Sequence, residues 1–348
     1  MRMKRKLPEE FAPRLCRWYR ENARPLPWRA DTAPYHVWLS EIMLQQTRIE
    51  AARDYYVRFL EALPTVEALA ACSEEKLLKL WEGLGYYSRA RNLHKAAQII
   101  CEQYGGAFPR DYAGILRLPG VGAYTAGAVG SICFGLPVPA VDGNVLRVIA
   151  RLLAIREAVD TPQVRREITA ALQTVYDTCP SPGILTQAIM ELGEVLCLPG
   201  TQPDCAPCPL AGLCKAYRGG RQKDYPVLSP KKPRRVESRT VFLIHAEGKL
   251  AVRKRPAGGL LGGMWEFPNA EGAMREERAS ALLACQGYKV DSIAIAKSHK
   301  HVFTHVVWHM QAYEVRVREA LPSEGLVWAT EAELREAYAL PTAFRVFL

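Results

Sequence analysis

The sequence lacks an apolar run of the length that a membrane-spanning helix needs, which is about 20 residues. It also lacks the pattern of a secretory signal, because the basic stretch from Met1 to Lys6 leads into Leu7-Pro8-Glu9-Glu10 instead of an apolar segment. We therefore expect the chain to stay in a reducing compartment. There its ten cysteines are not expected to form a disulfide framework.

Acidic residues are fewer than basic ones, 36 against 46, so the formal net charge is +10. This balance favours a polyanionic partner, either a nucleic acid or an anionic membrane surface. A basic protein without such a partner would have the same composition. With 348 residues, the chain is longer than one ordinary domain, and two domains are expected.

The first part of the chain has a helical pattern, and the last part has the pattern of strands. From Glu9 to about Leu196, apolar residues recur three and four positions apart, as in the stripe Val145, Val148, Ile149 and Leu152. After Thr240, short alternating runs predict strands, including one long stretch from His301 to Arg318. We expect a mainly α-helical domain over residues 1–220, a linker over 221–238 and a smaller α+β domain over 239–348.

Within the expected linker, residues 225–235 are basic, rich in proline and aperiodic. Such a segment is extended. It would either lie along a phosphate backbone or act as a solvated spacer, and the composition favours neither.

Four cysteines lie close together and form the pattern Cys-x7-Cys-x2-Cys-x5-Cys: Cys197, Cys205, Cys208 and Cys214. Four thiolates at this spacing suit a tetrahedral metal or an iron–sulfur cluster. Structural zinc usually takes two Cys-x2-Cys pairs, and only one is present, so an iron–sulfur cluster is favoured over zinc or over chance clustering. No His-x-Glu precedes the pair, which argues against a zinc deaminase.

A glycine-containing turn, Leu118-Pro119-Gly120-Val121-Gly122, separates two helical segments. Asp111 is placed to cap the first segment, and the second begins near Ala123. The glycines Gly120 and Gly122 let the backbone turn sharply, and the N–H groups at the start of the second helix can then hold a phosphate oxygen. An ordinary helix–helix turn is the alternative, and the basic chain around this one favours phosphate binding.

Glu41 lies on an otherwise largely apolar helical stripe with Trp38, Ile42 and Gln45. A carboxyl that is desolvated there has a raised pKa and can hold a proton near neutral pH, as a general acid must. By position alone, a glutamate at the exposed edge of a helix is the more common case.

Asp142 lies where the extended segment Val138 to Val141 meets a helix, which is the place of an N-cap. We expect the helix dipole and the N–H groups to lower the pKa of Asp142 and keep it ionised. A cap without any further role is the alternative. A proton-bearing acid and a fixed anion are, however, the two groups that cleavage of an N-glycosidic bond requires.

Five motifs together resemble those of the MutY-type adenine DNA glycosylases, in the same order along the chain. They are Leu26-Pro27-Trp28-Arg29, Ser40-Glu41-Ile42-Met43-Leu44-Gln45-Gln46-Thr47, Gly83-Leu84-Gly85-Tyr86-Tyr87-Ser88-Arg89-Ala90-Arg91, Leu118-Pro119-Gly120-Val121-Gly122-Ala123-Tyr124-Thr125 and Val141-Asp142-Gly143-Asn144. The glycine turn resembles the helix-hairpin-helix of this superfamily. The resemblance covers nearly the whole chain.

The resemblance implies a role for each of several side chains. Glu41 protonates the adenine ring and later activates water, and Asp142 stabilises the cationic sugar or forms a transient covalent adduct with it. Tyr124 and Asn144 support these carboxylates. A pocket for the flipped adenine and an insertion into the base stack beside the lesion are also implied. The pocket residues are Trp28, Arg29 and Gln187, and the stack residues are Gln46 and Tyr86.

The cysteine pattern resembles the 4Fe–4S loop of endonuclease III and its relatives, which implies a 4Fe–4S cluster as cofactor. That family has six residues in the first gap where this chain has seven, and the insertion falls in Leu198 to Asp204. The lyase-active branch has a lysine at the position of Tyr124. Because a lysine can form a Schiff base with the sugar and a tyrosine cannot, we expect base removal that leaves an abasic site without strand cleavage.

The last part of the chain resembles the Nudix-like module of the same family, which begins at Gly259-Leu260-Leu261-Gly262-Gly263-Met264-Trp265-Glu266-Phe267-Pro268. The Gly-x5-Glu-x7-Arg-Glu-x2-Glu-Glu box of a working Nudix hydrolase is absent, so hydrolysis of nucleoside diphosphates is not expected. Phe303-Thr304-His305 is similar to a Phe-Ser-His loop that contacts 8-oxoguanine, with Thr304 in place of serine. The alternative interpretation is that these three residues are part of an alternating strand and do not contact a lesion.

The expected function is therefore removal of adenine that is mispaired with 8-oxoguanine or guanine in double-stranded DNA, by a monomer. The resemblance implies a bacterial, cytoplasmic protein associated with the nucleoid. Three rivals are a thymine-mismatch glycosylase, a non-catalytic DNA-binding redox sensor and a Nudix hydrolase. The C-terminal module argues against the first, the pair Glu41 and Asp142 against the second, and the missing box against the third.

Overall fold

The computed structural model describes residues 5–200, 203–230, 232–321 and 325–348. The segment Met1 to Lys4, two residues of the stretch Leu198 to Asp204 in the cysteine loop and Lys231 of the expected linker lie outside the described residues. The chain divides by its contacts into two compact units. Unit 1 comprises residues 1–71 and 92–230, and unit 2 comprises residues 72–91 and 231–348. No helix of the described residues is long and apolar enough to cross a membrane.

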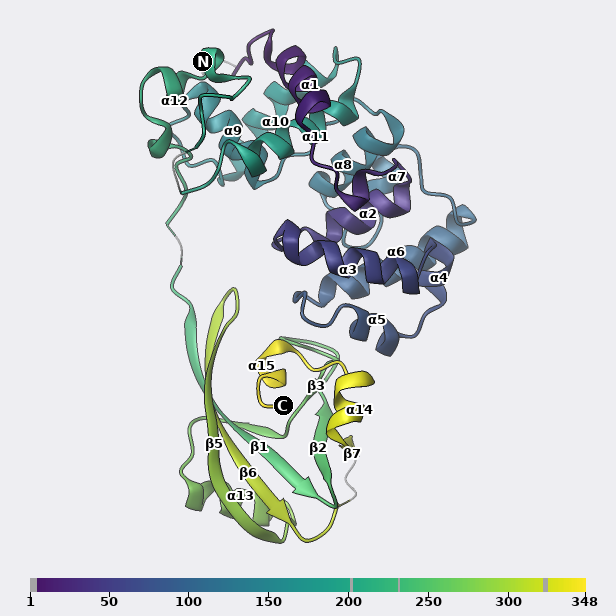
Figure 1. Cartoon of the computed structure of the whole chain (residues 1–348), viewed down its shortest axis with the longest axis vertical. Coiled ribbons are helices and arrows are strands. Elements are labelled where there is room, and N and C mark those ends of the chain that lie inside the picture. Colours follow the sequence, from purple (N-terminus) through teal and green to yellow (C-terminus); the bar gives the residue numbers. More distant parts are fainter. Residues whose placement is uncertain (1–4, 201–202, 231, 322–324) are drawn as a thin grey trace. The chain divides into compact units, whose positions relative to one another are not determined.

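Unit 1 is helical, as the sequence pattern predicts. Figure 1 shows its helices from purple at α1 to teal at α12. They are α1 (Phe11–Asn22), η1 (Pro27–Arg29), α2 (Pro34–Met43), α3 (Ile49–Ala62), α4 (Val66–Ala71), α6 (Ser88–Tyr104, which begins in unit 2), α7 (Tyr112–Leu116), α8 (Ala123–Phe134), α9 (Gly143–Leu153), α10 (Pro162–Tyr176), α11 (Pro182–Val195), η2 (Ala211–Leu213), α12 (Lys215–Arg218) and η3 (Gln222–Asp224).

Helix α9 contributes to an apolar core of unit 1. Its stripe Val145, Val148, Ile149 and Leu152 is at most 2% exposed and packs with apolar residues of α1, α10 and α11. The predicted periodicity is therefore confirmed, because the residues three and four apart share the buried face. Asp142 caps this helix, so burial of the stripe also fixes the position of that carboxylate.

Helix α8 packs closely against the extended segment that precedes α9. A Cβ atom at Gly127 would lie only 2.5 Å from the carbonyl oxygen of Pro139, so only glycine lets the two backbones approach this closely. Since α8 carries Tyr124 and the segment ends at Asp142, this contact sets the spacing of two candidate site residues. The glycine turn before α8 has Gly120 at φ 75°, and Asp111 accepts from the Gly114 N–H as the predicted cap of α7.

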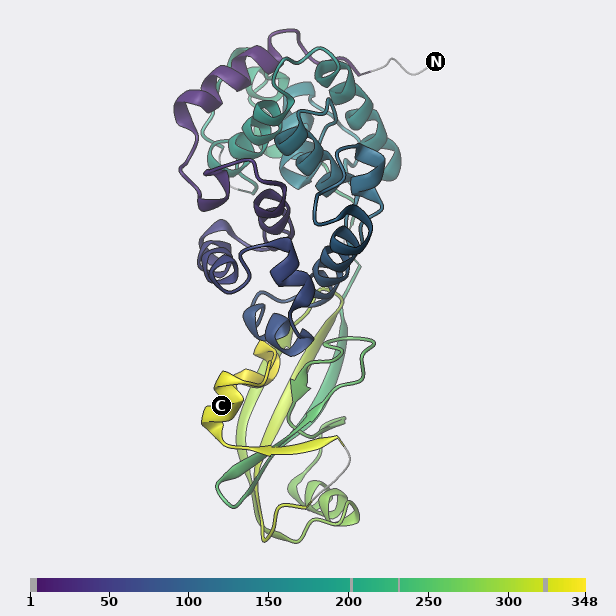
Figure 2. The same ribbon diagram turned by 90° about the vertical axis from the view of Figure 1, so that its right-hand side faces the viewer.

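Unit 2 is built around one sheet, with helices on both faces (Figures 1 and 2). The path of the sheet is β3-β2-β1-β6-β5, with β4 on β1 and β7 on β2, and the β1–β6 pair is parallel. The strands are β1 (Arg235–Ala246), β2 (Lys249–Lys254), β3 (Trp265–Glu266), β4 (Asn269–Glu271), β5 (Val290–Val302), β6 (Val306–Val317) and β7 (Leu326–Ala329). The helices are α5 (Glu74–Leu80), α13 (Glu276–Cys285), α14 (Glu331–Glu336) and α15 (Thr342–Arg345).

Each face of the sheet has its own core. Alternate residues of β1 point to opposite faces: Val241 and Leu243 pack with α14 and α15, and Phe242 and Ile244 pack with α13. This alternation explains why the last third of the sequence reads as strands. The predicted strand runs after Thr240 and after Leu250 are confirmed as parts of β1 and β2.

The long alternating stretch from His301 to Arg318 is not one strand, which corrects the sequence prediction. Strand β5 ends at Val302 and β6 begins at Val306, and the Phe303 N–H donates to the Val306 carbonyl across the turn. Phe303-Thr304-His305 therefore forms the tip of a hairpin. The sequence pattern did not indicate this turn, because the apolar alternation continues through it. Strand β1 also begins at Arg235, inside the segment expected to be linker.

Residues 72–91 belong to unit 2, although they precede most of the helical chain. The Glu82 carboxylate accepts from the Leu340 N–H at 2.8 Å and from Lys79 at 2.9 Å. Lys254 pairs with Glu75 at 2.8 Å. These polar contacts tie the segment that carries the Gly83 to Tyr86 loop to the C-terminal residues.

We predict that Gly127→Ala lowers the free energy of unfolding by about 1–3 kcal/mol, because the added methyl group overlaps the Pro139 carbonyl. Urea denaturation followed by far-ultraviolet circular dichroism measures the loss. Gly143→Ala is the matched control, since a Cβ there meets no atom within 4 Å. Equal stabilities of the two variants would contradict the proposed role of this close approach.

Candidate active site

A cavity of about 560 Å³ in unit 1 collects most of the side chains that the sequence singled out. Its wall comes from η1, α2, α8, α9 and α11 and from the turn after α2. The predicted residues that line it are Trp28, Arg29, Glu41, Gln46, Tyr124, Asp142, Asn144 and Gln187. Gly120 and Gly122 are not among its lining residues.

Glu41 is buried, with 7% of its surface exposed, on helix α2. The Tyr124 hydroxyl donates to Glu41 Oε2 at 2.5 Å. Burial raises the pKa of Glu41 to about 7, the Asp142 charge adds to the rise, and Tyr124 and Arg29 act against it. Helix α2 ends at Met43, so Gln45 lies beyond the predicted stripe, whereas Trp38 and Ile42 are buried as expected.

Tyr124 is held as a proton donor. Burial, with the Glu41 and Asp142 charges, raises the pKa of Tyr124 well above its usual range. The phenol therefore keeps its proton and points it at Oε2 of Glu41. A proton carried by Glu41 near pH 7 is then left on the other oxygen, Oε1, because Oε2 already accepts the tyrosine hydrogen bond.

Asp142 caps helix α9, as predicted, and its Oδ1 accepts from the Val145 N–H at 2.8 Å. The expected lowering of its pKa is wrong. Burial raises the pKa of Asp142 above its usual range, although the N–H groups of Val145 and Asn144 and the charge of Arg147 act in the opposite direction. Desolvation outweighs the helix N-terminus here because the carboxyl faces the cavity wall instead of bulk water.

The side chain of Asn144 does not bond to either carboxylate directly. It donates to Glu194 Oε1 at 2.8 Å and accepts from Arg147 at 2.6 Å. Arg147 also donates to the carbonyls of Gly193 and Cys197, at 2.9 and 2.7 Å. Asn144 is thus part of a network that fixes the start of α9 against the end of α11.

Glu191 lines the cavity and is paired with Arg24, and the sequence prediction missed both residues. The Glu191 side chain is fully buried and accepts from Arg24 at 2.7 and 2.9 Å and from Arg29 at 2.8 Å. Burial alone would raise the pKa of Glu191, but the bonds from the two arginines outweigh it and lower the pKa to about 2. Glu191 lies four residues after Gln187 on α11, and this spacing was the available signal.

The remaining pocket residues are fixed by packing. Trp28 is 8% exposed and lies edge-on to Tyr56 with ring centroids 5.5 Å apart. Gln187 accepts from the Tyr19 hydroxyl at 3.0 Å. Gln46 is exposed and has φ 60°, a left-handed conformation that non-glycine residues seldom adopt. Such strain is often retained at functional positions.

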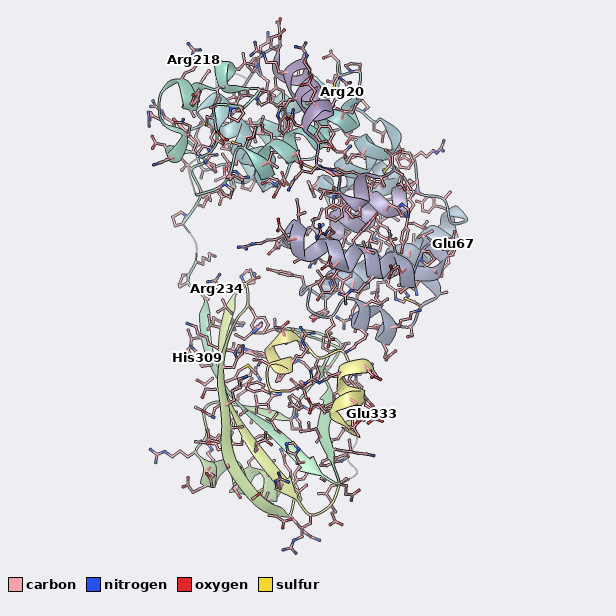
Figure 3. The ribbon with its side chains drawn as sticks, viewed as in Figure 1. Arg20, Glu67, Arg218, Arg234, His309 and Glu333 are labelled. Carbon is pink, nitrogen blue, oxygen red and sulfur yellow. The ribbon has the colours of Figure 1, made fainter. Side chains whose placement is uncertain are left out.

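The four cysteines of the predicted cluster line one small, mostly apolar pocket beside α9. The Arg151 guanidinium donates to Cys197 Sγ at 3.2 Å, and the Gln222 amide lies 3.9 Å from Cys205 Sγ. Within the described parts of the chain, no group of three or more His, Cys, Asp or Glu side chains is placed to hold a metal ion. The exposed arginines Arg20 and Arg218 of this unit are labelled in Figure 3.

Unit 2 brings a second group of predicted residues together. The Tyr86 hydroxyl and Thr304 Oγ1 are 2.7 Å apart, and Arg234, labelled in Figure 3, donates to the Thr304 carbonyl at 3.2 Å. The Phe303 ring packs between His301 and Trp308, with centroids 4.5 and 4.9 Å away. His305 is exposed at the hairpin tip. The tip is therefore fixed at Phe303 and open at Thr304 and His305.

Two family models match the chain. Residues 39–173 match the HhH-GPD superfamily of base excision DNA repair proteins, and residues 240–348 match the NUDIX domain. These matches confirm the expected fold class: a mainly α-helical glycosylase domain of the helix-hairpin-helix type, followed by a smaller Nudix domain built on a sheet.

Curated relatives from distant organisms share most of the chain. Adenine DNA glycosylase of Homo sapiens is 32% identical over 97% of this chain and 74% of its own length. The Mus musculus protein of the same name is 33% identical, over 96% and 76%. That of Buchnera aphidicola subsp. Acyrthosiphon pisum is 30% identical, over 88% and 87%.

Solved structures resemble the helical part. A thermostable thymine-DNA glycosylase aligns with a TM-score of 0.54 and 26% identity, over 60% of this chain and 95% of that chain. A trapped covalent intermediate of endonuclease III with DNA aligns with a TM-score of 0.51 and 25% identity, over the same shares. The helical part therefore has the same fold as these two solved structures.

We predict that Glu191→Gln lowers the free energy of unfolding at pH 7 by about 3 kcal/mol, because two arginines lose their buried counter-charge. A carboxylate with a depressed pKa stabilises the fold above its unfolded pKa of about 4.3, and this contribution disappears as the pH falls toward 2. Denaturation between pH 7 and pH 3 should therefore show the difference between wild type and variant shrinking with acidification.

Glu194→Gln is the control for Glu191→Gln, since it changes a neighbouring carboxylate of the same helix that is exposed and accepts a hydrogen bond from Asn144. Its effect on stability should stay within about 0.5 kcal/mol. A loss for Glu191→Gln that is no larger than this, at any pH, would show that the two arginines do not depend on Glu191.

Proposed function

This chain belongs to the adenine DNA glycosylases, a family of base excision DNA repair enzymes, and we propose that it removes adenine mispaired with 8-oxoguanine or guanine from duplex DNA. The observation that carries the proposal is the pair Glu41 and Asp142 on the wall of one cavity, where the Asp142 charge adds to the rise of the Glu41 pKa. A carboxyl that is protonated near neutral pH beside a second carboxylate is the arrangement that cleavage of a glycosidic bond uses.

Glu41 is the general acid of the proposed reaction. Its proton, on the oxygen that Tyr124 does not bind, passes to the adenine ring as the bond between the base and C1′ of the sugar breaks. Adenine then leaves as a neutral base instead of an anion, which lowers the barrier. The Glu41 carboxylate left behind next takes a proton from the attacking water, and the cycle closes with the acid restored.

Asp142 faces the positive charge that develops on the sugar. It stabilises the oxocarbenium-like sugar or attacks it, and both routes end in hydrolysis to an abasic site. The N–H groups of Val145 and Asn144 and the Arg147 charge favour its ionised form. The Asn144 network with Arg147 and Glu194 positions this helix end.

The flipped adenine occupies the cavity between Trp28, Arg29 and Gln187. Arg29 is held by Glu191 and lies over the Tyr19 ring at 5.4 Å, so its guanidinium is fixed before the base arrives. A preorganised donor loses little entropy on binding, which favours selection of one base. With Tyr124 where a lyase would have lysine, no Schiff base forms and the strand stays intact.

DNA grip and lesion recognition are assigned to other parts of the chain. The N–H groups that follow Gly120 and Gly122 hold a backbone phosphate without reading sequence. Tyr86 and Gln46 enter the base stack, and the hairpin tip Phe303-Thr304-His305 contacts 8-oxoguanine, with Thr304 as a hydroxyl donor or acceptor. In this proposal a monomer binds duplex DNA, with the helical unit as the glycosylase domain and the sheet-containing unit as the lesion module.

The four cysteines Cys197, Cys205, Cys208 and Cys214 fit a 4Fe–4S cluster as the proposed cofactor. All four line one small, mostly apolar pocket, and four thiolates around one pocket are the ligands that such a cluster takes. Arg151 donates to Cys197 Sγ, as donors to cluster thiolates do. The cluster would hold the loop after α11 in shape and supplies no group to the carboxylate chemistry.

We predict that Glu41→Gln reduces single-turnover adenine release from a duplex with A opposite 8-oxoguanine by at least about a thousandfold, while the dissociation constant for that duplex stays within about threefold. An amide cannot donate the required proton, but it fills the same space. Parallel duplexes with A opposite G and T opposite G test the substrate: release of thymine in place of adenine would favour a thymine-mismatch enzyme.

The pH dependence of adenine release by the wild type provides a second test of Glu41 as the acid. Since the pKa of Glu41 is raised to about 7, the acid form is lost above that pH, and the rate should fall about tenfold per pH unit there. Strand cleavage without added alkali would refute the proposed monofunctional activity. Adenine release by Glu41→Gln at the wild-type rate would show that Glu41 is not the general acid.

We predict about four irons and four sulfides per chain in protein purified without oxygen. Cys208→Ser should lose most of this iron and lower the stability of unit 1, whereas Cys285→Ser, which changes an exposed cysteine of unit 2, should keep it. Zinc in place of iron would contradict the cluster without affecting the proposed base removal.

A further inference from the structure

The loop that presents Tyr86 has an unusual backbone. Gly83 and Gly85 have φ of 98° and 71°, and Tyr86 itself has φ 48°. Two of these residues are glycines, for which the left-handed region is open, but Tyr86 is a bulky residue for which it is costly. The residue is nevertheless 43% exposed, so burial in the core does not hold the conformation. Some other group must stabilise this loop.

Arg89, in the first turn of α6, contacts the backbone of this loop. Its Nη2 donates to the carbonyls of Leu84 and Gly85, at 3.1 and 3.2 Å. Its guanidinium carbon lies 5.4 Å from the centroid of the Tyr86 ring and 5.4 Å from that of the buried Trp81 ring. One planar cation therefore contacts both the backbone of the loop and the ring that the loop presents.

Trp81 and Tyr87 also make hydrogen bonds to the backbone of the loop. The Trp81 Nε1–H donates to the Gly85 carbonyl at 3.2 Å, and the Gly83 N–H donates to the Tyr87 hydroxyl at 3.2 Å. Trp81 is fully buried and Tyr87 is 5% exposed, so both are rigid supports. Arg89 links this support to the Tyr86 ring, because its guanidinium lies over both the Trp81 and the Tyr86 rings.

We propose that Arg89 is a positioning residue for lesion recognition: it fixes the Tyr86 ring and, through the Tyr86–Thr304 contact, the hairpin tip of the lesion module. The inference rests on the proposed role of Tyr86 in the base stack. All four groups that it uses (Arg89, Trp81, Tyr86 and Thr304) belong to unit 2. Arg89 itself touches neither the base nor the reacting atoms in this proposal.

The chemistry of arginine suits this position better than that of lysine. A flat guanidinium with several N–H donors can donate to two carbonyls and lie over a ring face at the same time, and an ammonium group cannot. Burial lowers the pKa of Arg89 to about 10, and the group still carries its charge at neutral pH. A partly desolvated cation attracts an aromatic face more strongly than a fully hydrated one does.

The test compares Arg89→Met, Tyr86→Ala and the double variant in the full-length, cluster-containing protein. Single-turnover rates are measured on duplexes with A opposite 8-oxoguanine and A opposite G, after titration of active enzyme. We expect Arg89→Met to reduce the preference for 8-oxoguanine about tenfold, and the double variant to be no worse than Tyr86→Ala. Partial misfolding would lower both rates equally and leave the preference unchanged, so it cannot imitate this result.

Arg58→Met is the matched control, because Arg58 also lies over a tyrosine ring, 4.7 Å from the Tyr55 centroid, but on an exposed face of α3. It should keep the wild-type preference. Tyr86→Phe, which keeps the ring and loses the hydroxyl contact with Thr304, separates stacking from that contact. A base analogue that fluoresces when unstacked, placed beside the lesion, should respond to wild type and lose its response with Arg89→Met.

The outcomes separate the inference from the proposed function. If Tyr86→Ala keeps the preference, Tyr86 has no role at the lesion and the inference falls with that assignment. If Tyr86→Ala loses the preference and Arg89→Met keeps it, or if the two effects add in the double variant, only the positioning role is overturned. Should Arg89→Met fail to fold, Arg89→Lys, which keeps the charge but not the planar fork, is expected to lose part of the preference, and full retention would overturn the proposal.

Discussion

The hydrogen bond from Tyr124 to the buried carboxyl of Glu41 is the interaction on which the rest of the site depends. Removal of the carboxyl from water raises its pKa into the neutral range, and the tyrosine determines which oxygen remains for a proton. Neither group alone provides a proton donor at a fixed position. An exposed glutamate is ionised at pH 7, and the tyrosine acts only through its hydrogen bond to the carboxyl. The α2–α8 contact therefore provides chemistry as well as packing.

Backbone proximity at a few glycines makes this arrangement possible. Gly127 lets α8 lie against the segment that ends at Asp142, and a Cβ at Gly193 would lie 2.7 Å from Cβ of Asn144, where α11 meets the start of α9. The second carboxylate is thus placed by close contacts between helices instead of by a flexible loop. Rigid supports of this kind keep catalytic groups within the small tolerances that proton transfer requires.

Two of the described non-glycine residues with positive φ lie where contact with DNA is proposed, whereas Ala154, Glu247 and Leu261 lie elsewhere. Gln46 and Tyr86, one in each unit, both have positive φ without being glycine. Such a conformation persists only when neighbouring groups fix it, and Arg89, Trp81 and Tyr87 provide that support at Tyr86. The grouping of residues 72–91 with the C-terminal module places this support and the hairpin tip in one compact unit, so the exposed Tyr86 ring and Thr304 can act together.

The sequence alone determined what depends on neighbours along the chain: the buried stripe of α9, the caps at Asp111 and Asp142, the alternation of β1 and the spacing of the four cysteines. It also predicted most of the cavity residues, through motifs. Only the tertiary structure decided the burial of Glu41, the raised pKa of Asp142, the ion pairs of Glu191 and the Tyr86–Thr304 contact. It also placed Phe303 to His305 in a turn. Local patterns fix helices and caps, whereas desolvation and contacts between distant residues exist only after the chain has folded.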